Sequence, residues 1–259
     1  MGKRLPFLAA LSGPLVVEQL NLLLLDQQVS SLNLRRDDPR FSHLRDILAV
    51  SPGDWIDLAV QNGPKGKGEV TKEIDGSITL DITWLPVHPP DSYPISLVVG
   101  LARPQTCRKI LEQATAQGVG SFSFFEADKG EPSYAQSRLW TSDEWKRKIE
   151  AGVAQSFTSS VPGCSIFPNL GEALEKENKQ SVTGIALDNY EATGSLHAHL
   201  KGRSKQYVLC LGAERGWSDR ERKLLREYGY TLLHLGPRVL RVETAAVAAL
   251  GVISGSFYN

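Results

Sequence analysis

The sequence predicts an α/β protein in which a small β-barrel domain precedes a larger domain built on a mostly parallel sheet. Its 259 residues are enough for two modest domains, each with a core of its own. In the first third of the chain, two alternating runs joined by Asp75-Gly76 predict a β-hairpin. Beyond the proline-rich stretch 86–94, apolar strands alternate with amphipathic helices, which is the pattern of a parallel sheet.

The composition is that of an ordinary globular protein. Hydrophobic residues make up 41% and charged residues 22%, and 29 Lys and Arg balance 29 Asp and Glu. Net charge therefore gives no sign of a nucleic-acid partner. The three cysteines are widely spaced without a CxxC, and the histidines lack metal-ligand spacing. We expect neither a disulfide framework nor a metal site, no membrane span, and a cytoplasmic protein.

Residues 1–20 are expected to form an N-terminal extension. Lys3 and Arg4 precede an uncharged segment over 5–17, which also fits a secretory signal peptide. That segment contains Pro6 and Pro14, and no cleavage site of the usual small-residue type follows it. We therefore favour a packed or frayed extension over a signal peptide.

Residues 21–90 are expected to form the barrel domain. Short strands are expected at 21–25 and 55–60, and the hairpin at 68–85. Turns rich in glycine and proline separate these strands. The stretch 86–94 is expected to be an extended linker, because X-Pro bonds disfavour helix.

Residues 91–259 are expected to form the second domain. Its first helix is expected to begin at Pro104, which suits the first helical position, and to stop at Gly118. Five apolar runs are expected to be its strands: 95–101, 121–125, 182–187, 206–212 and 231–235.

Three further helices have clear sequence signals. Apolar residues at every fourth position predict an amphipathic helix over 142–159, with Ser142 as its N-cap. Ser218 and Glu221 form a capping box at the start of the next helix. A last helix is expected through 244–250.

The stretch from Lys201 to Arg241 is locally basic, with ten Lys or Arg against four acidic residues. An excess of this size can neutralise several phosphates. For four of these residues we favour the simpler interpretation, that they form the solvated face of a helix. These four are Arg220, Arg222, Lys223 and Arg226.

Two loops at the ends of late strands are the best candidates for a ligand site. They are LGAERGWSDRE at 211–221 and LGPRVLRVETAA at 235–246. Each follows a strand, contains glycine and precedes a helix, and open α/β sheets bind ligands beyond the carboxyl ends of their strands. Neither loop has the pattern of a Rossmann dinucleotide site or a P-loop. Ordinary turns do not explain the cluster of Arg241, Glu243 and Thr244.

These two loops resemble the paired C-terminal motif of the RsmE-type 16S rRNA (uracil-N3) methyltransferases of the SPOUT superfamily. The usual form of that motif is close to GPEGGFSxxE followed by LGxRILRxETA. The segments LDNYEATGSL at 187–196 and KILEQATAQGV at 109–119 are also similar to the family. The resemblance covers nearly everything from about Asn21 onward.

The resemblance implies a PUA-like, RNA-binding barrel over 21–90 and a SPOUT methyltransferase domain over 91–259. The second domain would carry a C-terminal trefoil knot, which elementary folding rules would not propose. The expected protein is a homodimer that uses S-adenosyl-L-methionine to methylate N3 of a uridine in 16S rRNA of the small ribosomal subunit.

The resemblance also implies roles for individual residues. Arg241 suits stabilisation of negative charge on the uracil carbonyl oxygens, because a guanidinium is always charged. Glu243 or Glu214 is a candidate acceptor for the N3 proton, with a helix cap or a partner for Arg241 as the alternative, and proton loss to solvent is also open. The RNA is expected to contact Arg35, Arg36, Arg40, Arg45, Arg203 and Arg215. The cofactor is expected to contact Leu187, Leu211, Gly212, Glu214, Gly216, Leu235, Gly236, Leu240, Arg241 and Thr244.

The sequence departs from the usual motifs at four positions. Ala49 and Thr158 stand where the family has arginine, and Ala213 and Arg215 replace the usual proline and glycine of the first loop. Three functions therefore stay open: methylation of a uridine in 16S rRNA, methylation of another RNA by the same fold, and RNA or ribosome binding without methyl transfer.

Overall fold

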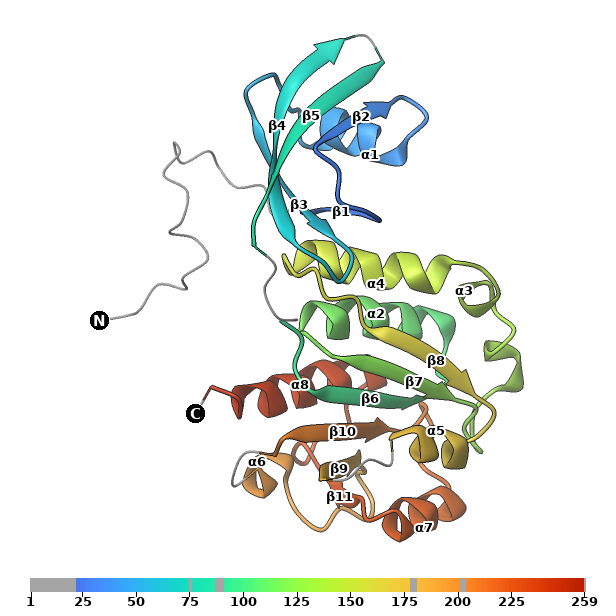
Figure 1. The fold of residues 1–259 in the computed structure, drawn as a ribbon. Coiled ribbons are helices and arrows are strands. Elements are labelled where there is room, and N and C mark those ends of the chain that lie inside the picture. The colour runs from blue at the N-terminus through green and yellow to red at the C-terminus, as the bar shows by residue number, and fades with distance from the viewer. Residues whose placement is uncertain (1–21, 75, 87–90, 178–180, 201–203, 259) are drawn as a thin grey trace.

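The computed structural model describes residues 22–74, 76–86, 91–177, 181–200 and 204–258. The expected N-terminal extension, and with it the alternative of a signal peptide, lies outside these residues. The described chain contains two β-sheets, each with helices beside it, stacked one above the other in Figure 1. In the described ranges, no helix is long and apolar enough to span a membrane.

The N-terminal sheet has five strands in the order β1-β3-β4-β5-β2. Strand β1 runs parallel to β3, and the remaining neighbours are antiparallel. The short helix α1 and the π-helical turn η2 lie between β2 and β3 and cover its core of leucine, isoleucine and valine. The elements are β1 (Leu22–Leu25), β2 (Ser31–Arg35), α1 (Pro39–Ser42), η2 (His43–Ile47), β3 (Trp55–Val60), β4 (Lys65–Ile74) and β5 (Ser77–Trp84).

The second sheet has six strands, all parallel, in the order β11-β9-β10-β6-β7-β8. Its strands are β6 (Ile95–Gly100), β7 (Ser121–Phe125), β8 (Gly163–Phe167), β9 (Val182–Leu187), β10 (Gln206–Leu211) and β11 (Thr231–Leu233). Its helices are α2 (Pro104–Ala116), η3 (Pro132–Tyr134), α3 (Arg138–Thr141), α4 (Glu144–Gln155), α5 (Leu170–Glu177), α6 (Leu196–His199), α7 (Asp219–Glu227) and α8 (Val242–Gly255). The expected α/β fold with a parallel sheet is confirmed.

Helices cover both faces of this sheet. Along β6, Leu97 and Val99 join the core beneath α2, α4 and α8, whereas Val98 joins the core beneath α5 and α7. Successive side chains of a strand point to opposite faces, so a strand buried on both faces is a continuous apolar run. The run from Ile95 onward is therefore apolar at both faces of the sheet, as a central parallel strand requires.

Most expected elements match the observed ones within two or three residues, with four corrections. Strands β2 and β8 and helices α1, α3 and α5 were not predicted. Helix α8 runs to Gly255, beyond its expected end at 250. Asp143, not Ser142, holds the N-cap position of α4: the Ser142 hydroxyl donates to the carbonyl oxygen of Arg138 and closes α3, although it also accepts the first N–H of α4, from Glu144, at 3.3 Å. Helix α4 ends at Gln155 rather than continuing to 159, because Phe157 adopts a left-handed backbone with φ of 55°.

The turn between β3 and β4 joins the two sheets. Asn62 donates its backbone N–H to the carbonyl oxygen of Ser159 (2.7 Å), and its side-chain oxygen accepts the N–H of Val161 (2.8 Å). Close by, the carboxylate of Asp91 accepts hydrogen bonds from Lys65 of β4 and from Thr158 and Ser160 behind α4. The N-terminal sheet is thus attached by directional hydrogen bonds to the segment that leads into β8.

Candidate active site

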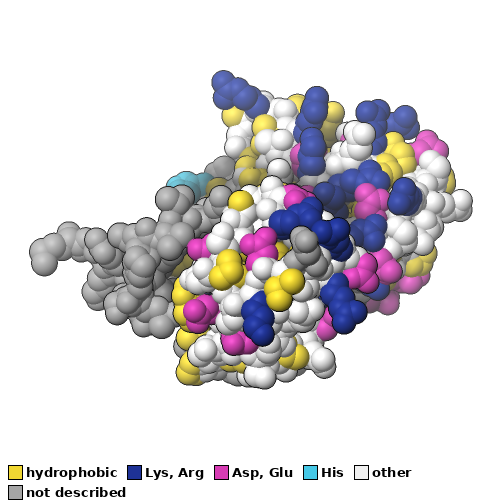
Figure 2. All heavy atoms as spheres, turned by 90° about the horizontal axis from the view of Figure 1, so that it is seen from above, with side chains coloured by type: hydrophobic (Ala, Val, Ile, Leu, Met, Phe, Trp, Pro, Cys, Tyr) yellow, Lys and Arg dark blue, Asp and Glu magenta, His cyan; other side chains and the backbone are white. Residues whose placement is uncertain are grey.

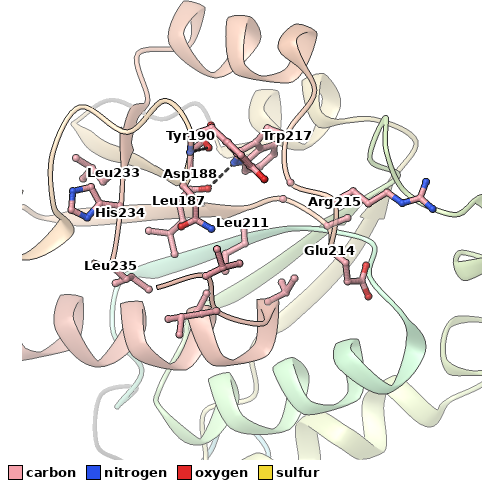
Figure 3. A pocket seen from close by; sticks show the side chains of 18 of the residues that line it. Leu187, Asp188, Tyr190, Leu211, Glu214, Arg215, Trp217, Leu233, His234 and Leu235 are labelled. Carbon is pink, nitrogen blue, oxygen red and sulfur yellow. Dashed lines mark hydrogen bonds between the residues drawn. The ribbon is translucent and has the colours of Figure 1, made fainter. Parts of the chain in front are cut away.

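A pocket opens beyond the carboxyl ends of β9, β10 and β11, where a parallel sheet is expected to bind its ligand. Three chain segments form it: 187–190 after β9, 211–217 after β10, and 233–245 from β11 into α8. Figure 3 shows His234 on one side of the pocket, with Glu214 and Arg215 on the opposite side. Both loops that the sequence singled out therefore reach the same cavity.

The structure brings seven of the ten expected cofactor residues to this pocket: Leu187, Leu211, Gly212, Glu214, Gly216, Leu235 and Leu240. The other three lie just outside its lining. Gly236 is in the turn after Leu235, Arg241 is the exposed N-cap residue of α8, and Thr244 is exposed in the first turn of that helix.

The loop after β10 depends on its glycines. A Cβ atom at Gly212 would lie 3.1–3.2 Å from backbone atoms of Gly216, which is tighter than ordinary packing. Gly216 itself has φ of 66°, a conformation that side chains disfavour. The loop consequently folds back on itself tightly and leaves its backbone facing the pocket.

Both candidate proton acceptors already have partners. Glu214 accepts the backbone N–H of Arg103 at 2.7 Å, so its carboxylate caps the start of α2. Glu243, whose side chain is only 10% exposed, pairs with Lys109 of α2 at 3.2 Å. The alternative of a helix cap or an ion-pair partner therefore fits both carboxylates, although neither partner is Arg241. Within the described chain, the Arg241 side chain makes no hydrogen bond or ion pair.

Sequence reasoning missed the ion pair that shapes the first segment of the pocket. The side chains of Asp188 and Arg222 are 2% and 7% exposed, and Arg222 Nε lies 2.5 Å from Asp188 Oδ2. This hydrogen bond raises the pKa of Arg222. The other carboxylate oxygen of Asp188 accepts the backbone N–H of Tyr190 (2.7 Å), and the Arg222 guanidinium lies 5.7 Å from the centre of the Tyr190 ring. Arg222 is thus a buried structural cation, not part of a solvated helix face.

Trp217 ties the second segment of the pocket to the first. Its indole Nε1 donates to the carbonyl oxygen of Leu187 at 2.8 Å, and the residue is 1% exposed. Two sequence signals pointed to the segments of Asp188, Tyr190 and Trp217: their place at strand ends, and the resemblance of 187–196 and 211–221 to the family's motifs. Neither signal gave these individual side chains a role.

Within the described part of the basic stretch 201–241, carboxylates compensate the cations of α7. Arg220 pairs with Asp128 and Arg226 pairs with Glu191, so acids from distant loops compensate cations of α7. The hydrogen bond from Arg220, helped by one from Ser218, lowers the pKa of Asp128. Lys223 lies 3.8 Å from Glu227 on the same helix. Counting charges within the stretch alone therefore overestimated its free positive charge.

Three exposed arginines remain around the pocket mouth: Arg215, Arg238 and Arg241. Lys201 and Arg203, which the sequence analysis included in the basic stretch, lie outside the described residues.

The arginines expected to hold RNA in the N-terminal sheet are all at its surface or half-buried. Arg40 forms a bidentate pair with Asp38, and Arg45 pairs with Asp46 while lying 5.0 Å from the centre of the Phe41 ring. Figure 2 looks onto this sheet from above and shows Lys and Arg interspersed with Asp and Glu. Arg35 and Arg36, at the end of β2, are exposed.

All three cysteines are free. In the part of the chain that the structure describes, no group of three His, Cys, Asp or Glu side chains is arranged to hold a metal ion.

Comparison with known proteins identifies the family. The model of a family described as "RNA methyltransferase domain" matches residues 89–254. The chain is 26% identical over 221 residues to "Ribosomal RNA small subunit methyltransferase E" of Treponema pallidum, covering 83% of this chain and 82% of the relative. The protein of the same name from Aquifex aeolicus is 30% identical over 150 residues, which cover 58% of this chain and 62% of the relative.

Solved structures have the same fold. The crystal structure of Ribosomal RNA small subunit methyltransferase E from Neisseria gonorrhoeae, bound to S-adenosyl methionine, aligns with a TM-score of 0.76 at 21% identity, over 91% of this chain and 97% of that one. A predicted RNA methyltransferase from Thermotoga maritima aligns with a TM-score of 0.67 at 22% identity, over 92% and 99%. The family match covers well over half of the sequence and includes every segment of the pocket, so this chain belongs to the RNA methyltransferase family.

Proposed function

We propose that the chain transfers a methyl group from S-adenosyl-L-methionine to N3 of a uridine in 16S rRNA of the small ribosomal subunit. The observation that carries the proposal is the pocket at the carboxyl edge of the sheet, where both motif loops meet. Relatives named ribosomal RNA small subunit methyltransferase E, and a solved structure of that name with the cofactor bound, support the substrate and the cofactor.

The residues present fit an adenosyl cofactor. Four leucines at 187, 211, 235 and 240 provide apolar walls, and the tight glycine loop brings backbone N–H and C=O groups to the cavity. When bound, S-adenosylmethionine supplies an electrophilic methyl group on its sulfonium. We assign the cofactor contacts to the seven expected residues that line the pocket, with Gly236, Arg241 and Thr244 bordering it.

The chain's own residues must then orient the uracil and stabilise charge on it. Removing the N3 proton spreads negative charge onto the flanking carbonyl oxygens. Arg241, exposed at the start of α8 and without a protein partner in the described chain, is the group we assign to those oxygens. Glu243 is held by Lys109, which favours a role in positioning the start of α8 over direct proton transfer. We therefore propose that the N3 proton leaves to solvent.

We further propose that residues 21–90 form a PUA-like RNA-binding domain and residues 91–259 a SPOUT methyltransferase domain. Separate hydrophobic cores in the two sheets support this division. RNA would contact Arg35, Arg36 and Arg45 of the first domain and Arg215 of the second. Arg40 and Arg203, the remaining arginines expected from the sequence, would contact the RNA as well.

We propose that the C-terminal segments form a trefoil knot and that the enzyme is a cytoplasmic homodimer. The order β11-β9-β10 supports the knot, because the chain returns across β9 after completing β10. The segment after β9 also bonds to the end of β11, through Thr193 to Leu232 and through Leu196 to His234. Exposed Tyr190 and Val239 beside the pocket support an interface between two copies, which sedimentation at micromolar concentration would test.

The test of the function is mass spectrometry of 16S rRNA from a strain lacking the gene, with and without its restoration. We expect N3-methyluridine to disappear from one position and to return with the wild-type gene but not with Arg241→Ala. If the methylation of 16S rRNA is unchanged in the strain lacking the gene and another RNA loses a methyl group, the enzyme has a different target. Unchanged RNA throughout, together with no binding of S-adenosylmethionine in calorimetry, would favour RNA binding without transfer.

One departure from the family motif has a structural explanation that weakens the non-enzymatic alternative. Thr158 is buried and donates to Asp91, so it serves the junction between the two sheets. Its presence in place of arginine therefore does not require loss of activity.

The RNA contacts have a separate test. Each phosphate contact that is removed should lower the slope of log affinity against log salt by about one. Arg215→Ala is expected to do so without changing the affinity for S-adenosylmethionine, and Arg226→Ala, which removes a cation already paired with Glu191, is the matched control. Equal slopes for both variants and the wild type would remove Arg215 from the RNA surface.

A further inference from the structure

His234 makes a hydrogen bond within the last segment of the pocket. Its ring atom Nδ1 accepts the backbone N–H of Gly236 at 3.0 Å. A side chain that accepts from the N–H two residues later closes a small turn, in the way that Asn and Asp close Asx turns. The residue lines the pocket between Leu233 and Leu235, as Figure 3 shows.

The backbone of His234 is held by hydrogen bonds on both of its peptide groups, whereas Gly236, which the ring contacts, is a residue with wide backbone freedom. His234 donates its N–H to the carbonyl oxygen of Gly194 (3.0 Å) and accepts the N–H of Leu196 (2.9 Å), which forms a bridge to the segment after β9. Gly236 has φ of 125°, and glycine has more backbone freedom than any other residue. The imidazole therefore connects a residue that is hydrogen-bonded to the segment after β9 with a glycine whose φ side chains disfavour.

We propose that His234 is a positioning residue for cofactor binding, and that it acts only while its Nδ1 is unprotonated. The inference rests on the proposed function, because it assumes that S-adenosylmethionine occupies this pocket. By holding Gly236, the imidazole sets the course of the chain from Leu235 to Leu240, both of which line the cavity. A proton on Nδ1 turns the acceptor into a donor, which faces the Gly236 N–H and breaks the bond.

The charged groups that line the same pocket as His234 have other partners or lie at its mouth. Asp188 pairs with Arg222, and Glu214 bonds to the start of α2. Arg215 and Arg238 are exposed lining residues. The segment that bridges to His234 leads into α6, which carries His197 and His199, both exposed. Over the described ranges, none of these seven side chains makes a hydrogen bond or ion pair with His234.

The test compares an isostere, a deletion and a control. In His234→Asn the side-chain amide oxygen can take the place of Nδ1 as acceptor, and it does not titrate near neutral pH. In His234→Leu the acceptor is removed. The control is His199→Leu, which removes an exposed imidazole from α6. Thermal unfolding of each variant establishes that it is folded.

Calorimetric titration with S-adenosylmethionine at pH 8 and at pH 5.5 gives the decisive pattern. At pH 8 we expect His234→Asn and the control to bind as the wild type does, and His234→Leu to bind about three- to tenfold more weakly, the range of one hydrogen bond. At pH 5.5 the wild type and the control should weaken toward the leucine variant, because a proton on Nδ1 removes the acceptor of the Gly236 N–H. His234→Asn should keep its affinity.

A second measurement examines the hydrogen bond itself. In a sample labelled with ¹⁵N, a scalar coupling between the Gly236 amide nitrogen and Nδ1 of His234 should be observed at pH 8 and should disappear at pH 5.5. A proton found on Nδ1 at pH 8 would overturn the inference.

The failures of the two proposals are distinguishable. A wild type that binds but is matched by His234→Leu at pH 8, or a His234→Asn variant that loses affinity at low pH as the wild type does, overturns the role of His234 and leaves the function intact. A wild type that binds no S-adenosylmethionine at either pH overturns the proposed function and this inference with it. If His234→Leu does not fold, the affinities of the wild type and of His234→Asn for S-adenosylmethionine at pH 8 and pH 5.5 still decide whether His234 has this role.

Discussion

Replacing Arg222 by methionine should destabilise the protein far more than its position on an arginine-rich helix suggests. The substitution keeps a long apolar stem but removes the partner of Asp188, whose side chain is 2% exposed. The carboxylate would then be left buried with the N–H of Tyr190 as its remaining hydrogen-bond donor in the described chain. Removing one member of a buried ion pair costs about 3–5 kcal/mol of unfolding free energy.

That cost translates into a measurable change in melting temperature. For a domain of this size, 1 kcal/mol shifts Tm by about 2–4 °C, so Arg222→Met should lower Tm by roughly 6–20 °C. The matched control is Arg226→Met, one turn further along α7, where the arginine side chain is 50% exposed and pairs with Glu191. An exposed pair of this kind contributes about 0.2–1 kcal/mol, so the control should lose less than about 4 °C.

The assay is thermal unfolding followed by circular dichroism, without S-adenosylmethionine, because a bound ligand would add its own stabilisation. The double variant Asp188→Asn with Arg222→Met removes both charges and should recover part of the loss, which gives the coupling energy of the pair. If Arg222→Met and Arg226→Met melt at the same temperature, the two cations have equivalent surroundings and the reasoning is refuted.

Three further expectations concern pH, thiol reactivity and the pocket. Burial acts to raise the pKa of Asp91, but its hydrogen bonds, led by the one from Lys65, lower it below the ordinary 3.8. A carboxyl group whose pKa is lower in the folded state than in the unfolded state stabilises the fold at pH values above its unfolded-state pKa, and this stabilisation is lost as the pH falls through its folded-state pKa. Chemical denaturation at a series of pH values should therefore show that Asp91→Asn loses less stability than the wild type below about pH 4. Burial raises the pKa of Cys107 and of Cys164 to about 12, so a thiol reagent at pH 8 should modify neither before the protein unfolds; rapid labelling of the native protein would contradict this. Gly236→Val places a β-branched residue at φ of 125° and should abolish calorimetric binding of S-adenosylmethionine while unfolding stays cooperative, whereas undiminished affinity would remove this turn from the cofactor site.

Local sequence signals predicted the parts of the fold that depend on local physics. The central strands are continuous apolar runs, and an Asp-Gly pair separates the two alternating runs of the hairpin in the sequence, so both were recognisable without tertiary information. Strand β8 lies at the edge of its sheet and is half exposed, and β2 is a short edge strand, so neither has the pattern of a buried strand. Ser142 was misassigned because it lies between two helices, and its hydroxyl closes the first of them.

The candidate site was predictable in its backbone but not in its charges. Both glycine-containing loops reach one pocket, as their position after late strands and the family motif indicated. The ion pairs behind that pocket join residues far apart in the chain: Arg222 bonds to Asp188, 34 residues away, and Arg220 bonds to Asp128, 92 residues away. A local sequence pattern cannot reveal carboxylate partners that lie so far away in the chain. The arginines of α7 were therefore interpreted from the sequence as a solvated basic face.

The position of α8 determines when during synthesis the core of the six-stranded sheet can be completed. Ala246, Ala249, Leu250 and Ile253 of this last helix belong to the same core as α2, whose residues are made much earlier. The N-terminal sheet has a core of its own and is complete at Trp84. At about 5–20 residues per second, a ribosome needs roughly 10–35 s to extend the chain from Trp84 to the end of α8 at Gly255. The N-terminal sheet can therefore fold while the six-stranded sheet still lacks α8, and the α2 side chains that share a core with α8 stay without that cover until the helix has been made.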